Sequence, residues 1–443
     1  MPSALLQAVR KLDNLERAWS VIRDNGRTSK SEAVRLELDE FAEDASHNLR
    51  SLKVRLQRNA FEFKGAKGIA IPKVDETGRR TGKIRPIVLA PVESRIVQRA
   101  ILDVLVEVPA LQPFVKMPFS FGGLRKEKQP PLPKGKRHLR SENLSAVPAA
   151  IKAVLDAIEQ GRNYVASADI RAFFTRIPKS AVSAVVARAV NDSEFMAFFD
   201  QAIDVELANM AELKEHASSF PIEDIGVAQG NSLSPLLGNI ILAGFDNVMN
   251  EGDCRCIRYI DDFIILAPSE RAANARLRKA TSLLNAMNME LSPEKSSKGS
   301  VSVKNSFDFL GINIAPGKIR PGTKAQNRFL ESIDNAFTEG RRAFVAVRNG
   351  QSLPRSRSLL ATLKRVDGMI DGWGKHYWFC NDDELFALLD TKIIQLVRQF
   401  LGSYRAIRSE LSDARQHLLL GLTELSTIPR EPFSYPKATA KQV

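Results

Sequence analysis

The chain carries the segment Cys254-Arg255-Cys256-Ile257-Arg258-Tyr259-Ile260-Asp261-Asp262-Phe263-Ile264-Ile265-Leu266-Ala267. The runs on either side of the acids predict two strands, and a tight hairpin between them would present Asp261 and Asp262 at its tip. Adjacent carboxylates repel each other, and a divalent cation is the natural compensation. An ordinary hairpin turn is the alternative, since Asp is common in turns for backbone reasons, and the four residues Tyr259 to Asp262 alone favour it.

A third carboxylate shifts this balance. Asp169 ends the apolar run Tyr164 to Ile170, which predicts another strand, and Phe173 and Phe174 follow. If this strand lies in the same sheet as the hairpin, the three acids could hold two Mg²⁺ ions roughly 3.5–4 Å apart, an arrangement suited to in-line phosphoryl transfer. The two phenylalanines could equally be core residues.

Small and flexible residues lie between these acids. The stretch 226–235, which includes Gln229 and Gly230, is rich in Gly and Ser and then becomes helical. Such a loop lets a nucleotide or template approach the backbone closely, although an ordinary helix N-cap would look similar. Beyond the hairpin, 290–295 places Lys295 on a turn, and 307–311 predicts a short apolar strand ending in a glycine.

The alternation of predicted strands and helices, followed by a helical C-terminal third, predicts an α+β fold. Amphipathic helices are expected over about residues 1–60, and strands at 69–73 and 83–89 predict a hairpin that bears Lys73, Lys83 and Arg85. Helices are expected at about 92–106, 147–160, 179–215 and 269–289, short strands near 300–320, and a helical, basic region from about 324. The basic, proline-containing stretch 125–140 is either a solvated linker or a phosphate-contacting loop.

Composition narrows the class of protein. The net charge of +13 over 443 residues favours a polyanionic partner such as nucleic acid, with a merely soluble basic surface as the alternative. Three cysteines make a disulfide framework or a zinc site improbable. We find no run of about 18 apolar residues and no secretory signal pattern, so we expect a cytoplasmic protein without a membrane span.

In order and spacing, these segments resemble the reverse transcriptases over roughly residues 68–380. Each piece alone has a false-positive risk, but all of them in order make a strong pattern. The resemblance implies a right-hand polymerase: an N-terminal helical extension (1–62), fingers (63–160, with the basic loop 125–140), a palm (161–320, an antiparallel sheet plus helices, with interleaved fingers helices at about 179–220), a helical thumb (321–425) and a polar tail (426–443).

The resemblance also implies roles for individual residues. The metal would be bound by Asp169, Ile170, Asp261 and Asp262, and the catalytic residues would be Asp169, Asp261, Asp262 and Lys295. The dNTP would be bound by Lys73, Arg85, Phe174, Gln229 and Gly230, where Phe174 would block a ribose 2′-hydroxyl. Template and primer would be bound by Tyr259, Phe309, Leu310, Gly311, Arg125 and Lys126. The cofactor would be two Mg²⁺ ions, for which Mn²⁺ could substitute.

One segment bears on the branch of the family. The stretch 370–377 (Ile-Asp-Gly-Trp-Gly-Lys-His-Tyr) resembles the thumb signature of bacterial group II intron-type enzymes. A core stripe of Trp373 and Tyr377 at i, i+4 is the alternative, and both readings can hold together. We find no cysteine-rich or His-Asn-His nuclease segment and no Val-Thr-Gly thumb motif of retrons. The chain therefore most resembles the stand-alone "unknown group" reverse transcriptases, many of which defend against phage.

The leading hypothesis is thus an RNA-directed DNA polymerase that copies an associated structured non-coding RNA in antiviral defence, with dNTPs as substrates and DNA as product. Two alternatives stay open: a template-independent or protein-primed polymerase on the same palm, and a structural RNA-binding protein with a decayed active site. The sequence leaves the oligomeric state open.

Overall fold

The protein is described by a computed structural model that covers residues 3–29, 31–74, 79–124, 144–422, 425 and 428–434. It is an α+β fold whose strand pairs are all antiparallel, as the sequence predicts. The chain forms two compact units, Met1–Asn305 and Ser306–Val443. The predicted boundaries of fingers, palm and thumb stay predictions.

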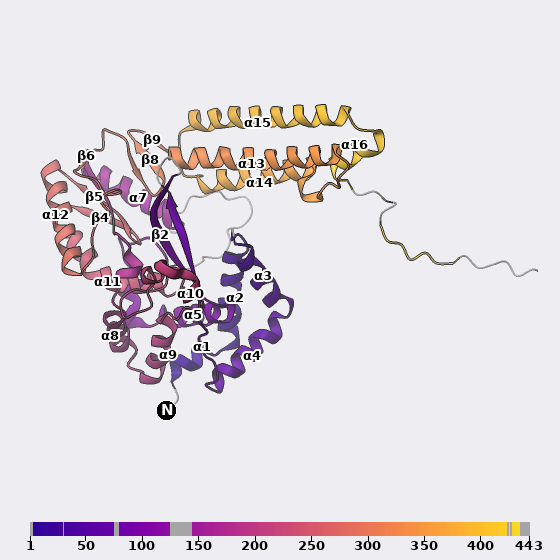
Figure 1. The fold of residues 1–443 in the computed structure, drawn as a ribbon. Helices are drawn as coiled ribbons and strands as arrows, with labels where there is room; N and C mark the ends of the chain where they lie inside the picture. The colour runs from indigo at the N-terminus through magenta and orange to yellow at the C-terminus, as the bar shows by residue number, and fades with distance from the viewer. Residues whose placement is uncertain are drawn as a thin grey trace, which may run out of the picture. The chain divides into compact units, whose positions relative to one another are not determined.

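The first unit contains helices and three-residue-per-turn (η) segments around two sheets (Figure 1). The helices are α1 (Ala4–Val9), α2 (Leu12–Gly26), α3 (Glu32–Glu43), α4 (Ala45–Gln57), α5 (Val92–Leu105), α6 (Gln112–Val115), α7 (Ala146–Glu159), α8 (Lys179–Val190), α9 (Ser193–Ile203), α10 (Met210–Leu213), α11 (Ser234–Met249), α12 (Glu270–Ala286), η1 (Pro109–Leu111), η3 (Phe173–Arg176) and η4 (Lys214–Ser219). The strands are β1 (Lys67–Val74), β2 (Arg80–Leu89), β3 (Tyr164–Asp169), β4 (Arg255–Tyr259), β5 (Asp262–Ala267) and β6 (Val301–Ser302).

The N-terminal helices form because their apolar residues recur at helical spacing and bury one face. Leu15 of α2 and Leu52 of α4 are fully buried, in one hydrophobic core with Ile96 of α5. This core continues into the central sheet through Ala166 of β3 and Phe263 of β5. The helical region is therefore continuous with the packing that supports the sheet.

The central sheet has the strand order β4-β5-β3-β6. Its register places Asp169 of β3 opposite Asp262 of β5, and Asp262 opposite Tyr259 of β4. Helices α7 and α11 pack against β4, and α12 packs against β3 and β5. Strands flank β5 on both edges, and helices α7 and α12 pack against it. Its residues 263–267 are all buried, which explains their continuous apolar run.

The hairpin β1–β2 forms a separate two-stranded sheet, with Ile71 opposite Arg85 and an irregularity between Pro72 and Val74. Its base is held by backbone hydrogen bonds: Ala66 pairs with the segment 206–208, and Val88 N donates to Gln229 O at 3.2 Å. The hairpin therefore starts beside the loop that contains Gln229 and Gly230.

The second unit has a three-stranded sheet in the order β7-β8-β9, followed by helices. Its elements are β7 (Phe307–Phe309), β8 (Ile312–Ala315), β9 (Lys318–Pro321), α13 (Thr323–Arg348), η5 (Arg355–Arg357), α14 (Leu359–His376), α15 (Asp383–Ser409) and α16 (Asp413–Leu420). Helix α13 packs against α14 and α15 (Figure 1). Trp373 packs against the hydrophobic core of this unit and stacks on Phe329, with ring centroids 4.3 Å apart. It also contacts Tyr377 at 4.6 Å, as the predicted i, i+4 aromatic pair.

Three further expectations from the sequence concern the cysteines, membrane-spanning helices and the basic stretch 125–140. All three cysteines are free, with Cys254 and Cys256 buried and Cys380 half-buried. In the described part of the chain no helix is both long and apolar enough to cross a bilayer. The basic stretch 125–140 lies outside the described residues, so its two interpretations stay open.

Candidate active site

The hairpin β4–β5 turns over two residues, Ile260 and Asp261, and brings the predicted acids to one end of the sheet. Asp261 O accepts a hydrogen bond from Ile170 N at 2.9 Å, and Asp169 lies opposite Asp262 in the register. Ile260 has φ +63°, while Asp261 is outside the positive-φ region. A positive φ at the first loop residue alone is the pattern of a type II′ hairpin turn, which prefers glycine at that position.

The acids repel one another at this end of the sheet. Burial raises the pKa of Asp261, and the nearby Asp169 carboxylate raises it further. Burial, followed by the charges of Asp169 and Asp261, raises the pKa of Asp262 to about 6. Both carboxylates are therefore held in surroundings that disfavour their charged forms unless a cation approaches.

Lys295 is the cation that contacts this group directly. Its Nζ lies 2.6 Å from Asp169 Oδ2, and its side chain is 60% exposed whereas that of Asp169 is 10% exposed. The turn carrying Lys295 is fixed on β3, because Ser292 N donates to Asp169 O at 2.8 Å and Ser296 Oγ accepts from Asp169 N at 3.2 Å. The predicted turn lysine thus reaches one of the predicted acids.

The donor chemistry of the acids fits Mg²⁺, which prefers carboxylate oxygens together with substrate oxygens. Their mutual repulsion also fits a site completed by a cation. Within the ranges that the structure describes, however, no three His, Cys, Asp or Glu side chains converge closely enough to coordinate one ion. The Asp169 carboxylate instead bonds Lys295, so a metal would have to compete with this ammonium group.

Cations of the β1–β2 hairpin act on the same site. Desolvation lowers the pKa of Lys73, the charges of Lys295 and Arg85 lower it further, and the charge of Asp169 opposes them. Lys73 and Arg85 are both exposed. They therefore offer solvent-facing positive charge near the acids, as a triphosphate-binding group requires.

The glycine-rich loop adjoins both the η3 segment that follows Asp169 and the β1–β2 hairpin. Val227 N donates to Phe174 O at 2.8 Å, and Val88 N donates to Gln229 O. Gly230 has φ +125°, and a Cβ there would lie 2.9 Å from Val88 O. The backbone at Gly230 thus approaches β2 too closely for a side chain. Through these contacts the loop connects Phe174 to the β1–β2 hairpin.

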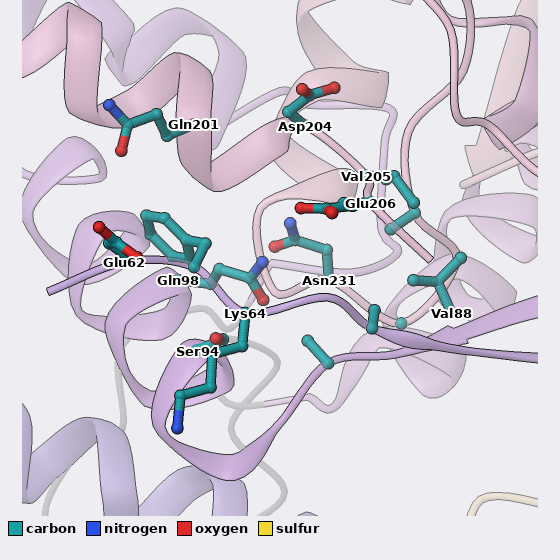
Figure 2. A pocket seen from close by; sticks show the side chains of 15 residues that line it. Glu62, Lys64, Val88, Ser94, Gln98, Gln201, Asp204, Val205, Glu206 and Asn231 are labelled. Atoms are coloured by element: carbon teal, nitrogen blue, oxygen red, sulfur yellow. The ribbon is translucent and has the colours of Figure 1, made fainter. Parts of the chain in front are cut away.

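Residues of this loop, among them Asn231, line a cavity of about 250 Å³ (Figure 2). Gln98 and Asn231 line it, and the amide nitrogens of both donate to Ala202 O, at 3.0 and 2.9 Å. Gly230 also lines the cavity, whereas the three acids do not. The cavity is therefore next to the candidate site and separate from its carboxylates.

The remaining predicted residues are dispersed. Tyr259 ends β4 beside the acids and is half-buried. Phe309, Leu310 and Gly311 form the β7–β8 turn of the second unit, where Phe309 is buried and the other two have positive φ. Arg125 and Lys126 lie outside the described residues.

Sequence reasoning missed Arg258 and Asp246, which form a buried group behind the turn with Ser120 and Asn239. The available signal was Arg258 itself, an arginine between the apolar Ile257 and Tyr259, two residues before the turn.

Comparison with known proteins gives one family match and one curated relative. Residues 71–314, more than half of the chain, match the family described as reverse transcriptase (RNA-dependent DNA polymerase). Protein YkfC of Escherichia coli (strain K12) is 26% identical over 203 residues, which are 46% of this chain and 45% of that protein. The match thus spans less than half the length of this relative.

Three solved structures are similar at low TM-score. A partial Cas6-RT-Cas1–Cas2 complex has 18% identity and a TM-score of 0.33, covering 65% of this chain and 43% of that one. Apo telomerase from Candida tropicalis has 14% identity and a TM-score of 0.37, covering 82% and 68%. Telomerase from Candida albicans with a telomeric RNA fragment has 12% identity and a TM-score of 0.39, covering 82% and 61%.

The family match spans the β1–β2 hairpin, the three acids and the glycine-rich loop, and on this ground the chain belongs to the reverse transcriptase (RNA-dependent DNA polymerase) family.

Proposed function

We propose that the protein is an RNA-directed DNA polymerase that adds dNTPs to a primer 3′-hydroxyl. One observation carries the proposal: Asp169 and Asp262 lie opposite each other in the sheet, and the carbonyl of Asp261 is tied to the end of the same strand as Asp169. Membership of the family supports the reaction class, and this juxtaposition supports our proposal that the reaction occurs at this end of the sheet.

Asp169, Asp261 and Asp262, with Ile170 beside them, would hold two Mg²⁺ ions, or Mn²⁺ in their place. When bound, such ions lower the pKa of the attacking hydroxyl and stabilise the leaving pyrophosphate. The raised pKa values of Asp261 and Asp262 support a cation requirement, because a divalent ion would restore their charged forms.

Side chains and backbone groups of the chain itself would bind the dNTP and supply a proton. Lys73 and Arg85 would neutralise the triphosphate, and Lys295, released from Asp169, would donate a proton to the leaving pyrophosphate. Phe174 would lie against the sugar, where it would exclude a ribose 2′-hydroxyl. The backbone at Gln229 and Gly230 would pack against the nucleotide.

Contacts to the polymers complete the proposal. Tyr259 and the turn Phe309-Leu310-Gly311 would hold the primer, and Arg125 and Lys126 the template. The boundaries given above for fingers, palm and thumb belong to this proposal.

The test is incorporation of dNTPs on a primed RNA template by the wild type and by D261N/D262N. We expect the double variant to lose incorporation, and D253N, an exposed acid of the same unit, to retain it. Retained incorporation in D261N/D262N would overturn the proposal. Incorporation without any template would replace it by a template-independent activity, and wild-type RNA binding without Mg²⁺-dependent synthesis would indicate a decayed enzyme.

We further propose that the template is a cognate structured non-coding RNA and that the protein acts in the cytoplasm in antiviral defence. The net charge of +13 supports a polyanionic partner. The likeness to stand-alone "unknown group" enzymes supports the defence role.

Sequencing of co-purified RNA should return one dominant species, and random cellular fragments would refute a cognate RNA. Phage plating with wild type and D261N/D262N should show protection only with the wild type. Binding of that RNA should weaken steeply with salt, because phosphate contacts release counterions.

A further inference from the structure

Arg258 is a fully buried arginine on β4, two residues before the acidic turn. Its Nε and Nη2 donate to the carboxylate of Asp246 at 2.9 and 2.5 Å, and Nη2 also donates to Asn239 Oδ1 at 3.1 Å. Its Nη1 donates to the carbonyl of Ile260 at 2.9 Å. The guanidinium therefore connects a buried carboxylate on α11 to the backbone of the turn itself.

Ile260 needs such a contact because its conformation is unfavourable. A β-branched residue at φ +63° is an outlier, and a residue held in this region costs on the order of 1–3 kcal/mol. The surrounding structure must therefore hold the turn. The hydrogen bond from Arg258 Nη1 acts on the carbonyl of this same residue, which fixes the peptide that joins Ile260 to Asp261.

A neighbouring segment fixes the position of Arg258. Arg258 N donates to Phe119 O at 2.8 Å, and Phe121 N donates to Arg258 O at 2.9 Å. A Cβ at Gly122 would lie 2.6 Å from the Ile260 side chain, so this glycine lets the segment lie directly against the turn. The segment 119–122 thus holds both ends of the strained stretch.

The same group extends to the glycine-rich loop. Asn239 and Asp246 lie seven residues apart on α11 and therefore on one face of it, and α11 begins at Ser234, just after that loop. Ser120 Oγ donates to Asn239 Oδ1 at 3.1 Å. A Cβ at Gly123 would lie 2.3 Å from Pro235, the second residue of α11. One polar network therefore holds both the Ile260–Asp261 turn and helix α11, which follows the glycine-rich loop.

Stability alone does not account for this ion pair. Removing two charges from water costs free energy that their attraction repays only in part, and a well-packed apolar pair often serves stability as well or better. An apolar pair could not donate to Ile260 O. The distinctive contribution of Arg258 is therefore the placement of that carbonyl.

We propose that Arg258, anchored by Asp246, is a positioning residue that holds the Ile260–Asp261 turn in the conformation in which Asp261 and Asp262 face Asp169. The expected loss of reaction rate rests on the proposed function. The placement of the acids by Arg258 does not depend on which template or substrate is used.

The decisive variant is R258M/D246L, which removes the donor to Ile260 O without leaving a buried charge unpaired. We expect a folded protein whose melting temperature is near that of the wild type. We expect kcat for dNTP addition to fall roughly tenfold to a hundredfold, since small misplacements of catalytic groups cost this much. KM for the dNTP should stay nearly unchanged, and the Mn²⁺ concentration for half-maximal binding, followed by electron paramagnetic resonance, should rise.

A rescue separates positioning from packing. Glycine adopts positive φ at little cost, so I260G in the R258M/D246L background should restore part of both kcat and Mn²⁺ affinity. A residue that acts only through packing would show no such rescue. The single variant R258M, which strands Asp246, should melt at a much lower temperature and serves as the stability control.

Wild-type kcat and Mn²⁺ affinity in R258M/D246L would overturn the proposal, as would losses that I260G does not reverse. If the wild type itself shows no synthesis, the proposed function fails, and the Mn²⁺ measurements still decide the role of Arg258.

Discussion

The ion pair between Lys295 and Asp169 is unequal, because the ammonium is largely exposed and the carboxylate largely buried. Pairs with one exposed partner contribute little to stability, typically about 0–1 kcal/mol. A proton donor to the leaving pyrophosphate would contribute far more to the rate, about a hundredfold or more. We therefore predict that K295A lowers kcat by about two orders of magnitude with almost no change in melting temperature.

Single-nucleotide incorporation and a thermal melt of K295A check this prediction. K298A is the matched control, because Lys298 is an exposed lysine on the same loop. Equal kcat in the two variants would mean that Lys295 forms only a surface ion pair and donates no proton.

Gly230 and Gly244 form a natural pair for a second test. Gly230 has φ +125° and no room for a Cβ beside Val88 O, whereas Gly244 is helical, with nothing within 4 Å of a Cβ. We predict that G230A lowers the free energy of unfolding by about 1–3 kcal/mol and impairs dNTP use. G244A should raise it by up to about 1 kcal/mol. Urea denaturation of both variants gives the comparison, and equal midpoints would contradict it.

At the scale of residues, the sequence identified candidate site residues where a charged side chain interrupts or ends an apolar run. Carboxylates at strand ends stand out in an apolar run, so Asp169 and Asp261 could be found without a structure. Arg258 could not be assigned in this way, because its partner Asp246 is twelve residues away on a helix and the pairing depends on tertiary packing. The positive φ of Ile260 was equally hidden, since isoleucine gives no local signal for it.

At the scale of elements, the β1–β2 hairpin allows a prediction about pH. The pKa of Lys73 is lowered by desolvation and by the cations Lys295 and Arg85. Lys73 is charged below its pKa and loses its charge as pH rises through it. If it binds the triphosphate, kcat/KM for the dNTP should fall on the alkaline side of the profile. The fall should begin at lower pH than for an ordinary lysine, because the pKa is lowered.

K73R and K73A test this assignment together. The guanidinium of K73R stays charged at high pH, so its alkaline fall should disappear or move to higher pH. K73A should raise KM by about tenfold, the effect of losing one charge-assisted hydrogen bond. K67A is the control at the other end of the hairpin, where the exposed Lys67 lies opposite Leu89. An unchanged profile in K73R would exclude Lys73 from triphosphate binding.

The elements themselves were largely predictable, because hydrophobic periodicity and turn residues are local. The predicted helix at about 92–106 is α5 (Val92–Leu105), and the predicted strand 164–170 is β3, one residue shorter. The strand predicted at 83–89 begins earlier, at Arg80, since its exposed first residues are held by pairing across the hairpin and carry no apolar signal. The pairing of 119–121 with Arg258 is non-local and had no signal in the sequence.

At the scale of the whole molecule, the two compact units have separate cores. The core of the second unit is built around Phe400, which is fully buried and stacks on Phe337 and Phe344 at 4.7 and 5.4 Å. The core of the first unit includes the fully buried Phe199. The sequence indicated a helical C-terminal region, but the division at Asn305 follows from which residues share a core, and this depends on packing.

Separate cores predict separate unfolding. Replacing a buried phenylalanine by alanine costs about 3–5 kcal/mol. We predict that F400A lowers one transition in differential scanning calorimetry and leaves the other in place, and that F199A does the reverse. The tryptophans assign the transitions, since Trp19 lies in the first unit and Trp373 and Trp378 in the second. In a W19F background, fluorescence should therefore follow only the transition that F400A shifts. A single transition that moves equally in both variants would mean that the two cores unfold as one. The second unit would then stabilise the sheet that carries Asp169 and Asp262 as well as its own helices.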